Sequence, residues 1–294
     1  MSGRRDGRSA RDRARPGFSL AEVIVGLVIL AIVAVLFTRL IVSQARFFDR
    51  QATSNAARNV SRGSLNRVVS DLRMVEAEGG VLAATTTSVT VRVPYAMGVV
   101  CLTSGSPLAT EVSLLPVDSV MYNALGFYGY GWRDNATGNF TYVESGAAVG
   151  AKNIAGACTS NQITTVTNGI RVSLTPGLPA AATLGTPILL FRRIRYEFLP
   201  SVLVPGSTGL FRTVIYQNGS TTSEELAAPF ASTASFAFFT IESQTAQTSP
   251  PADLTTLRGF ELHFDGMSER TPSGKTVRAT APFTTAVFFR NRLT

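Results

Sequence analysis

The alternation of apolar and polar residues changes twice along the chain, and the first run is almost entirely apolar. Residues 18–37 are twenty residues with one charge, Glu22, and no proline. At about 1.5 Å of rise per residue, a helix of this length spans roughly 30 Å, the thickness of a bilayer's hydrocarbon core. A segment in lipid must satisfy its own backbone hydrogen bonds, which favours a helix despite many β-branched residues. We therefore predict a transmembrane helix over residues 18–38.

The second run, residues 39–80, is polar with apolar residues at helical spacing. Proline is absent from residues 17–93, so the helix is free to continue. The apolar positions that share one helical face are Leu65, Val68, Leu72 and Val75. Gly79 and Gly80 predict a helix end after Glu78. This amphipathic half is expected to pack its apolar stripe on a globular domain.

Three arginines follow the predicted transmembrane segment on one narrow helical stripe. They are Arg39, Arg46 and Arg50, separated by close to two turns and one turn. Contact with lipid headgroups and solvent is the favoured interpretation, and a specific acidic partner is the alternative.

After residue 80 the apolar period changes from 3.6 to 2, which indicates strands. The alternating runs are 89–93, 170–174, 194–198, 210–216, 234–241, 259–264 and 284–289. Asn218-Gly219 predicts a turn between two of them, and Glu224–Ala228 predicts a short helical turn. No amphipathic helices alternate with the strands, so a parallel sheet is disfavoured. The predicted fold class is α+β, a long N-terminal helix packed on an antiparallel β-sheet domain over residues 81–294.

Three further stretches of the head domain read as irregular from composition. Leu102–Pro116 and Thr175–Pro187 are rich in small and turn-forming residues and are predicted to be loops. Gly126–Thr141 concentrates aromatic residues, including Trp132, among glycines and asparagines. These aromatic side chains either bind a partner or glycan, or pack a hairpin onto its own sheet, which is the commoner arrangement.

The charge of the chain is unevenly placed. The total formal charge is +8, and residues 1–17 hold six arginines and two aspartates, which gives this leader +4. The dense positive charge places the leader in the cytoplasm by the positive-inside rule. Without the leader the chain carries +4, too little to indicate a nucleic-acid partner. The N-terminal region does not fit a secretory signal peptide, which would have a shorter apolar run followed by a small-residue cleavage site.

Cys101 and Cys158 are the only cysteines, and both fall in the part expected outside the cytoplasm. One disulfide is the simplest prediction for an oxidising compartment, and two buried unpaired thiols are the alternative.

The leader and the run Gly17-Phe18-Ser19-Leu20-Ala21-Glu22 together resemble the prepilin signal of the type IV pilin superfamily. The resemblance implies that a prepilin peptidase cleaves after Gly17 and methylates the new N-terminal Phe18. It also implies that the Glu22 carboxylate pairs with the Phe18 amine of a neighbouring subunit. Cleavage after Gly17 places that amine at the depth of Glu22 in a staggered neighbour, so the pair would set the axial register between subunits.

The second half of the chain narrows the resemblance. The segments RRIRYEFLP, GLFRTVIYQNG, FAFFTI and LRGFELHF are similar to the C-terminal pattern of PilW-type minor pilins, and J-type pseudopilins share that layout. The expected function is a minor pilin that initiates or caps a type IV pilus-like filament. The alternatives are a minor pseudopilin of a type II secretion system and a pilus-tip adhesin or DNA-uptake subunit. The expected partners are the prepilin peptidase, other major and minor pilins and the inner membrane, with the head domain periplasmic or extracellular.

Catalytic and metal-binding patterns are weak throughout. His263 is the only histidine and lies in a strand-like run, and no serine occupies a Gly-x-Ser-x-Gly turn. One histidine and two distant cysteines make a poor metal site. We therefore expect no enzymatic activity, no cofactor and no metal.

Overall fold

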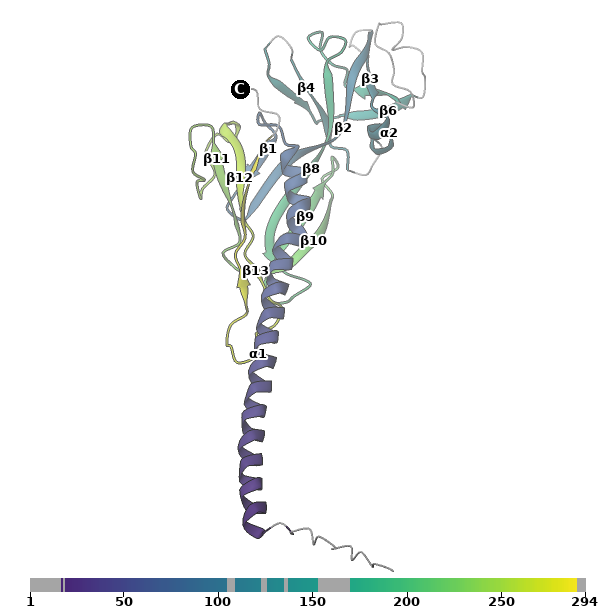
Figure 1. Cartoon of the computed structure of the whole chain (residues 1–294). Coiled ribbons are helices and arrows are strands. Elements are labelled where there is room, and N and C mark those ends of the chain that lie inside the picture. Colours follow the sequence, from purple (N-terminus) through teal and green to yellow (C-terminus); the bar gives the residue numbers. More distant parts are fainter. Residues whose placement is uncertain are drawn as a thin grey trace, which may run out of the picture. The chain divides into compact units, whose positions relative to one another are not determined.

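The structure is a computed structural model that describes residues 17, 19–104, 109–122, 126–134, 137–152 and 170–289. The chain divides at residue 50 into two units, residues 1–50 and residues 51–294. Helix α1 (Leu20–Arg73) begins in the first unit and ends in the second (Figure 1).

In the second unit, one face of α1 packs on the β-sheet domain. The buried residues of this face are Thr53, Ala57, Ser61, Ser64, Val68, Asp71 and Leu72. They recur every three or four residues, which is the spacing of one helical face. The expected α+β architecture, with a long N-terminal helix packed on an antiparallel sheet, is confirmed.

Helix α1 ends at Arg73, five residues before the predicted end at Glu78. The Met74 and Val75 amides donate to the carbonyls of Asp71 and Leu72, at 3.2 and 3.3 Å, so the last turn tightens to three-residue spacing. The chain then folds back so closely on itself that a Cβ on Gly80 would lie 2.1 Å from the Glu76 carbonyl oxygen. The two glycines therefore serve the turn that follows the helix.

One antiparallel sheet of twelve strands forms most of the second unit, in the order β14-β13-β10-β9-β8-β2-β3-β7-β6, with β1, β4 and β5 beside this path. Its strands are β1 (Val81–Ala84), β2 (Ser88–Ser104), β3 (Ala109–Leu114), β4 (Gly129–Arg133), β5 (Phe140–Val143), β6 (Ala148–Lys152), β7 (Arg171–Thr175), β8 (Pro187–Pro200), β9 (Thr208–Ile215), β10 (Thr221–Phe230), β13 (Gly266–Met267) and β14 (Thr280–Ala281). A separate sheet has the order β11-β12-β15, from Ser235–Thr240, Leu257–His263 and Thr284–Phe288. Within the residues that the structure describes, the helices besides α1 are α2 (Pro116–Met121) and the 3-10 turn η1 (Leu254–Thr256).

The long strands β2 and β8 pair along most of their lengths and belong to two lobes. The start of β2 pairs with β1, and the end of β8 pairs with β9. These strand segments pack with α1 and the three-stranded sheet, and we call this part the helix lobe. The end of β2 pairs with β3, and the start of β8 pairs with β4; with β5, β6 and β7 they form what we call the outer lobe (Figure 1). The pairing register of β2 with β8 shifts between Pro94 and Ala96. A bulge of this kind accommodates a proline and bends β2 between the two lobes.

Each lobe has its own hydrophobic core. The helix lobe encloses a group of phenylalanines, Phe198, Phe230, Phe236 and Phe264. The ring centroid of Phe198 lies 5.5 Å from that of Phe230 and 5.4 Å from that of Phe236, which is the range of favourable aromatic pairs. In the outer lobe, Tyr130, Trp132 and Leu190 pack with the valines of β2, β3 and β7.

The strand predictions hold, and two local predictions need correction. The predicted helical turn at Glu224–Ala228 lies within strand β10, which pairs with β9. The predicted loop Leu102–Pro116 contains the end of β2 and all of β3. In Gly126–Thr141, β4 pairs with β5 as a hairpin, and Tyr130 and Trp132 are buried. The aromatic segment therefore packs on its own sheet, as the commoner alternative predicted.

Candidate processing and assembly site

The predicted processing site lies immediately before α1. Gly17 is exposed, and a Cβ built on it meets no atom within 4 Å. Phe18 lies outside the described residues. Any substitution at Gly17 therefore has room in the chain itself, so a block in processing would report recognition by a peptidase.

Ser19 and Glu22 form a capping box at the start of α1. The Glu22 amide donates to Ser19 Oγ at 3.2 Å, and the Ser19 amide donates to Glu22 Oε2 at 2.9 Å. The Ser19 hydroxyl donates to the same carboxylate oxygen at 3.2 Å. This reciprocal pairing satisfies amide groups that have no partner at a helix start, and the negative charge suits the positive end of the helix dipole. Glu22 thus stabilises the helix start within a single chain.

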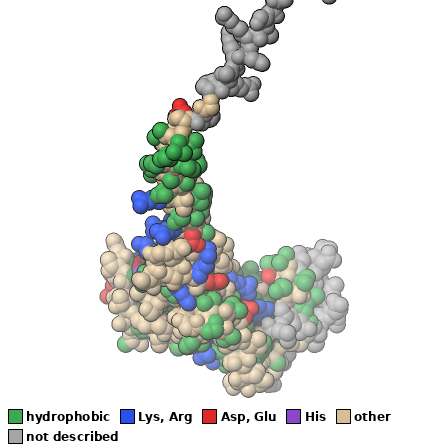
Figure 2. All heavy atoms as spheres, turned by 90° about the horizontal axis from the view of Figure 1, so that it is seen from below, with side chains coloured by type: hydrophobic (Ala, Val, Ile, Leu, Met, Phe, Trp, Pro, Cys, Tyr) green, Lys and Arg blue, Asp and Glu red, His purple; other side chains and the backbone are tan. Residues whose placement is uncertain are grey.

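The first part of α1 exposes its apolar side chains on every face. Between Leu20 and Phe37 the large apolar residues are 40% to 79% exposed. By length and composition α1 is suited to cross a membrane, and within the described residues none of its apolar segment is buried. Figure 2 shows hydrophobic side chains over the visible face of this part of the helix. Such a surface requires lipid or other apolar helices to cover it.

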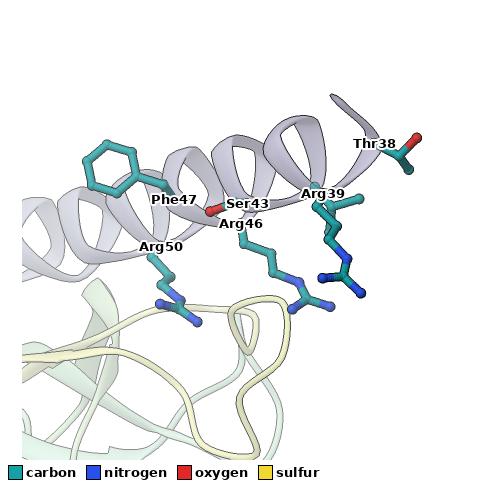
Figure 3. Close-up of a pocket in the computed structure, with 7 residues that line it drawn as sticks. Thr38, Arg39, Ser43, Arg46, Phe47 and Arg50 are labelled. Carbon is teal, nitrogen blue, oxygen red and sulfur yellow. The ribbon is translucent and has the colours of Figure 1, made fainter. Parts of the chain in front are cut away.

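The three arginines Arg39, Arg46 and Arg50, which we call the arginine stripe, follow this apolar segment. They line an open hollow of about 480 Å³ together with Thr38, Val42, Ser43 and Phe47. In Figure 3 the three guanidinium groups project from one side of α1, and the Phe47 ring points away from them. Phe47 and Phe48 are 62% and 68% exposed, so this part of α1 is amphipathic with a cationic and an aromatic side.

A buried polar cluster joins the end of α1 to the sheet. The Tyr196 hydroxyl on β8 donates to Asp71 Oδ2 at 2.6 Å, and Arg212 Nε on β9 lies 3.3 Å from the same oxygen. Glu224 on β10 also pairs with Arg212, at 3.3 Å. Burial and the adjacent Asp71 carboxylate raise the pKa of Tyr196 well above its ordinary value. The tyrosine hydroxyl is therefore a permanent donor, and the cluster fixes α1 against two strands.

A second polar cluster links the two lobes. Glu144, just after β5, accepts from Arg92 Nε on β2 at 2.8 Å and from Arg193 on β8 at 2.7 Å. The Arg92 guanidinium also lies 4.2 Å from the centroid of the Tyr142 ring. Burial and the nearby Glu76 carboxylate raise the pKa of Tyr142, so this ring stays neutral. We refer to Arg92, Glu144 and Arg193 as the inter-lobe cluster.

The predicted disulfide is described at one end only. Cys101 is fully buried in β2, and Cys158 lies outside the described residues. The pairing stays a prediction. His263 lies on β12 with Nε2 2.7 Å from Glu261 Oε1, an arrangement of two neighbouring side chains on one strand face.

Sequence reasoning missed Asp71 and Arg212. Both interrupt an otherwise apolar pattern: Asp71 lies on the face of Val68 and Leu72, and Arg212 lies between Leu210 and Val214 on alternate positions of β9. Opposite charges at core positions of two elements are the signal that could have predicted a buried pair.

Comparison with known proteins supports the N-terminal part of this description. Residues 12–38 match the prokaryotic N-terminal methylation motif, which is the type IV pilin-like prepilin signal. No curated protein and no solved structure matches the chain. The motif and the apolar helix support a type IV pilin-like or pseudopilin-like subunit that is processed at its N-terminus.

Proposed function

We propose that the chain is a minor pilin that helps to initiate or cap a type IV pilus-like filament, and that it has no catalytic role. The observation that supports this most directly is the methylation motif at residues 12–38, which overlaps the start of α1, where the large apolar side chains between Leu20 and Phe37 are exposed. After cleavage this helix can leave the bilayer only if other apolar helices cover it. A filament core of parallel pilin helices provides that cover.

The minor role is supported by the course of α1 through Arg39. Many major pilins have a proline at this helical position, whereas here the α-helix runs without interruption from Leu20 to Arg73. A proline removes a backbone hydrogen bond and kinks a helix, which makes it easier to melt. An unkinked helix suits a subunit at the filament end better than one repeated along it.

A minor pseudopilin of a type II secretion system remains the alternative, because it would share the same motif and helix. Neighbouring genes distinguish the two: a retraction ATPase favours the pilus, and a secretin with secreted hydrolases favours secretion. The alternative of an adhesin or DNA-uptake subunit has less support, because Tyr130 and Trp132 are buried, although Phe127, Tyr128 and Phe140 of the same segment are partly exposed.

The test is a matched pair of variants, Gly17→Leu and Gly26→Leu. A Cβ at either glycine meets no atom within 4 Å, so neither change strains the chain. Mass spectrometry of membrane extracts should show that the Gly17→Leu variant retains residues 1–17. The same variant should be absent from sheared filaments. Gly26→Leu should begin at a methylated Phe18, as in the wild type. Normal cleavage of Gly17→Leu, or leader retained in assembled wild-type filaments, contradicts the proposal.

The minor role has its own measurement. Quantitative mass spectrometry of sheared filaments should find this chain at a small fraction of the main subunit, and deletion of its gene should reduce filament number. An abundance equal to that of the main subunit would show that the chain is a bulk component.

A further inference from the structure

We infer that the arginine stripe binds the phosphate groups of anionic phospholipids at the membrane surface opposite to the leader. The inference rests on the proposed membrane insertion of α1, and it assigns a ligand to a surface that the filament proposal leaves without one. The ligand chemistry is a phosphate diester carried on a lipid.

The depths of Arg39 and Arg46 fit the headgroup layer, whereas the Arg50 Cα lies about 20 Å beyond that of Phe37 along the helix and is the outermost of the three. Residues 20–37 span about 27 Å as a helix, close to the hydrocarbon thickness of roughly 30 Å. Headgroups extend the bilayer to about 40–45 Å in total, and the Arg39 Cα lies only ~3 Å beyond that of Phe37 along the helix. The Arg46 Cα lies ~14 Å beyond, and helical side chains lean toward the N-terminus, which is back toward the membrane. In Figure 3 the Arg46 and Arg50 side chains lean toward the Thr38 end.

The geometry of the stripe suits a phosphate. Spacings of seven and four residues put the three side chains on one side of α1, around the hollow of about 480 Å³. A guanidinium presents a planar fork of donors that matches phosphate oxygens in a bidentate way. Two such groups one above the other can hold neighbouring headgroups or both sides of one.

The local charge calls for an anionic ligand. Residues 38–70 hold six arginines and a single carboxylate, Asp49. Within the described part of the chain, Arg39 and Arg46 are exposed and form no ion pair. Cleavage of the leader removes its six arginines, so in the mature chain the dense positive charge beside the apolar segment lies on this side alone.

A lipid fits better than an acidic protein surface because the other side of the same segment is aromatic. Phe47 and Phe48 are highly exposed, and their rings contact at 6.0 Å between centroids. A helix segment with basic residues on one side and aromatic residues on the other is typical of the membrane interface. An acidic protein partner would explain the arginines and leave the exposed rings without a role.

The test compares two double variants of the mature chain, which begins at Phe18 and lacks the six arginines of the leader. Each variant is purified in detergent, titrated with dioleoyl-phosphatidylglycerol or dioleoyl-phosphatidylcholine and followed by native mass spectrometry. Arg39→Gln/Arg46→Gln removes two charges of the stripe. Arg58→Gln/Arg62→Gln removes two exposed charges about 32 and about 38 Å of helix rise after Phe37 and is the matched control. Each arginine near a surface should contribute about fivefold in affinity, so the first double variant should lose roughly 25-fold for phosphatidylglycerol. The control and the phosphatidylcholine titration should not change.

Three outcomes overturn the inference. Equal wild-type affinities for the two lipids, or an equal loss in the control variant, exclude a specific headgroup site. Full competition by inorganic phosphate at the lipid concentration identifies a soluble-anion site. Unchanged lipid binding together with reduced filament incorporation identifies an acidic surface of a neighbouring subunit as the partner. The lipid titration uses a chain produced without the leader and needs neither peptidase processing nor assembly, so its failure is separable from failure of the filament proposal.

Discussion

Glu22 caps the start of α1, and it is also the only charged residue in an otherwise apolar segment, residues 18–37. The capping box with Ser19 accounts for the carboxylate in an isolated chain. It does not require the charge, because a glutamine at this position caps in the same way. A charge inside a membrane segment costs about 2.5–3.5 kcal/mol on insertion scales, so its presence points to a partner for the charge itself.

Two substitutions at Glu22 separate the cap from the charge. Glu22→Ala removes both, and Glu22→Gln keeps the cap and removes the charge. We expect both variants to insert and to be cleaved, and both to crosslink poorly to other pilins at positions flanking residue 22, because neither can pair with the Phe18 amine of a neighbour. Wild-type crosslinking and filament number in Glu22→Gln would assign the residue's role to the cap alone.

Asp71 is the residue whose removal should cost the fold most among the described ion pairs of α1. Asp71→Ala leaves the Arg212 side chain, 6% exposed, with Glu224 as its remaining carboxylate. Breaking a buried pair costs about 3–5 kcal/mol, and the residual Glu224 contact favours the lower end. Arg67→Ala is the control, because the Arg67 side chain is 53% exposed and lies 3.8 Å from Asp71. It should cost less than about 1 kcal/mol.

Urea unfolding of the full-length chain in detergent measures both variants. Equal losses for Asp71→Ala and Arg67→Ala would show that the Arg212 pair contributes nothing beyond a surface contact.

At the scale of elements, the sequence predicts α1 and the strands through their periods, and it misses contacts made by small or charged residues. Val68 and Leu72 follow the apolar period and were predicted to pack. Thr53, Ala57 and Ser61 are equally buried, yet they carry no apolar signal. Ala57 and Ser61 lie where strand β13 approaches the helix backbone, which leaves room only for small side chains: the Gly266 amide donates to Ser61 Oγ at 3.0 Å, and a Cβ on Gly266 would lie 2.2 Å from the Ala57 carbonyl oxygen. Such close contacts depend on where two distant segments meet.

The dependence on contacts between distant segments also explains why strand β10 was predicted as a helical turn and why the Asp71–Arg212 pair was missed. Glu224 and Glu225 favour a helix locally, but their carboxylates bind Arg212 and the amides of Val202 and Leu203, which fixes them in a strand. The junction at Gly17 and Glu22 is a local motif, so the sequence alone locates it. Long-range pairing, as in Asp71 with Arg212, requires the fold.

Two glycines test the close approach of α1 and β13. A Cβ at Gly266 would lie 2.2 Å from the Ala57 carbonyl oxygen and 2.4 Å from Ser61 Oγ, whereas a Cβ at Gly63 meets nothing within 4 Å. Gly266→Ala should therefore destabilise the chain by about 1–3 kcal/mol through overpacking. Gly63→Ala should stabilise it by roughly 0.5–1 kcal/mol, because alanine favours an exposed helix. Thermal unfolding of the two variants should shift in opposite directions, and a shift of the same sign in both would refute the close contact.

At the scale of the whole second unit, two hydrophobic cores share one pair of strands. β2 and β8 run from the helix lobe into the outer lobe, so neither lobe can lose its central strands without affecting the other. The Gln217 amide nitrogen, in the turn after β9, adds a direct link by donating to the Ala147 carbonyl at 2.9 Å. Strands β2 and β8 therefore connect the packing of the two lobes directly.

This arrangement predicts that the two lobes unfold in one cooperative transition. Glu144→Ala removes the carboxylate shared by Arg92 and Arg193, which lies at 2.8 and 2.7 Å from them. Charged hydrogen bonds of this kind contribute about 1.5–3 kcal/mol, so the melting temperature should fall by roughly 5 °C. The control is Glu197→Ala, which removes the partner of the more exposed Arg195 on the same strand β8. This control should lower the melting temperature by less than Glu144→Ala does. Calorimetry of the full-length chain in detergent should show one transition in all three proteins. If the wild type or Glu144→Ala gives two separate transitions, the lobes unfold independently, and the shared strands do not couple them.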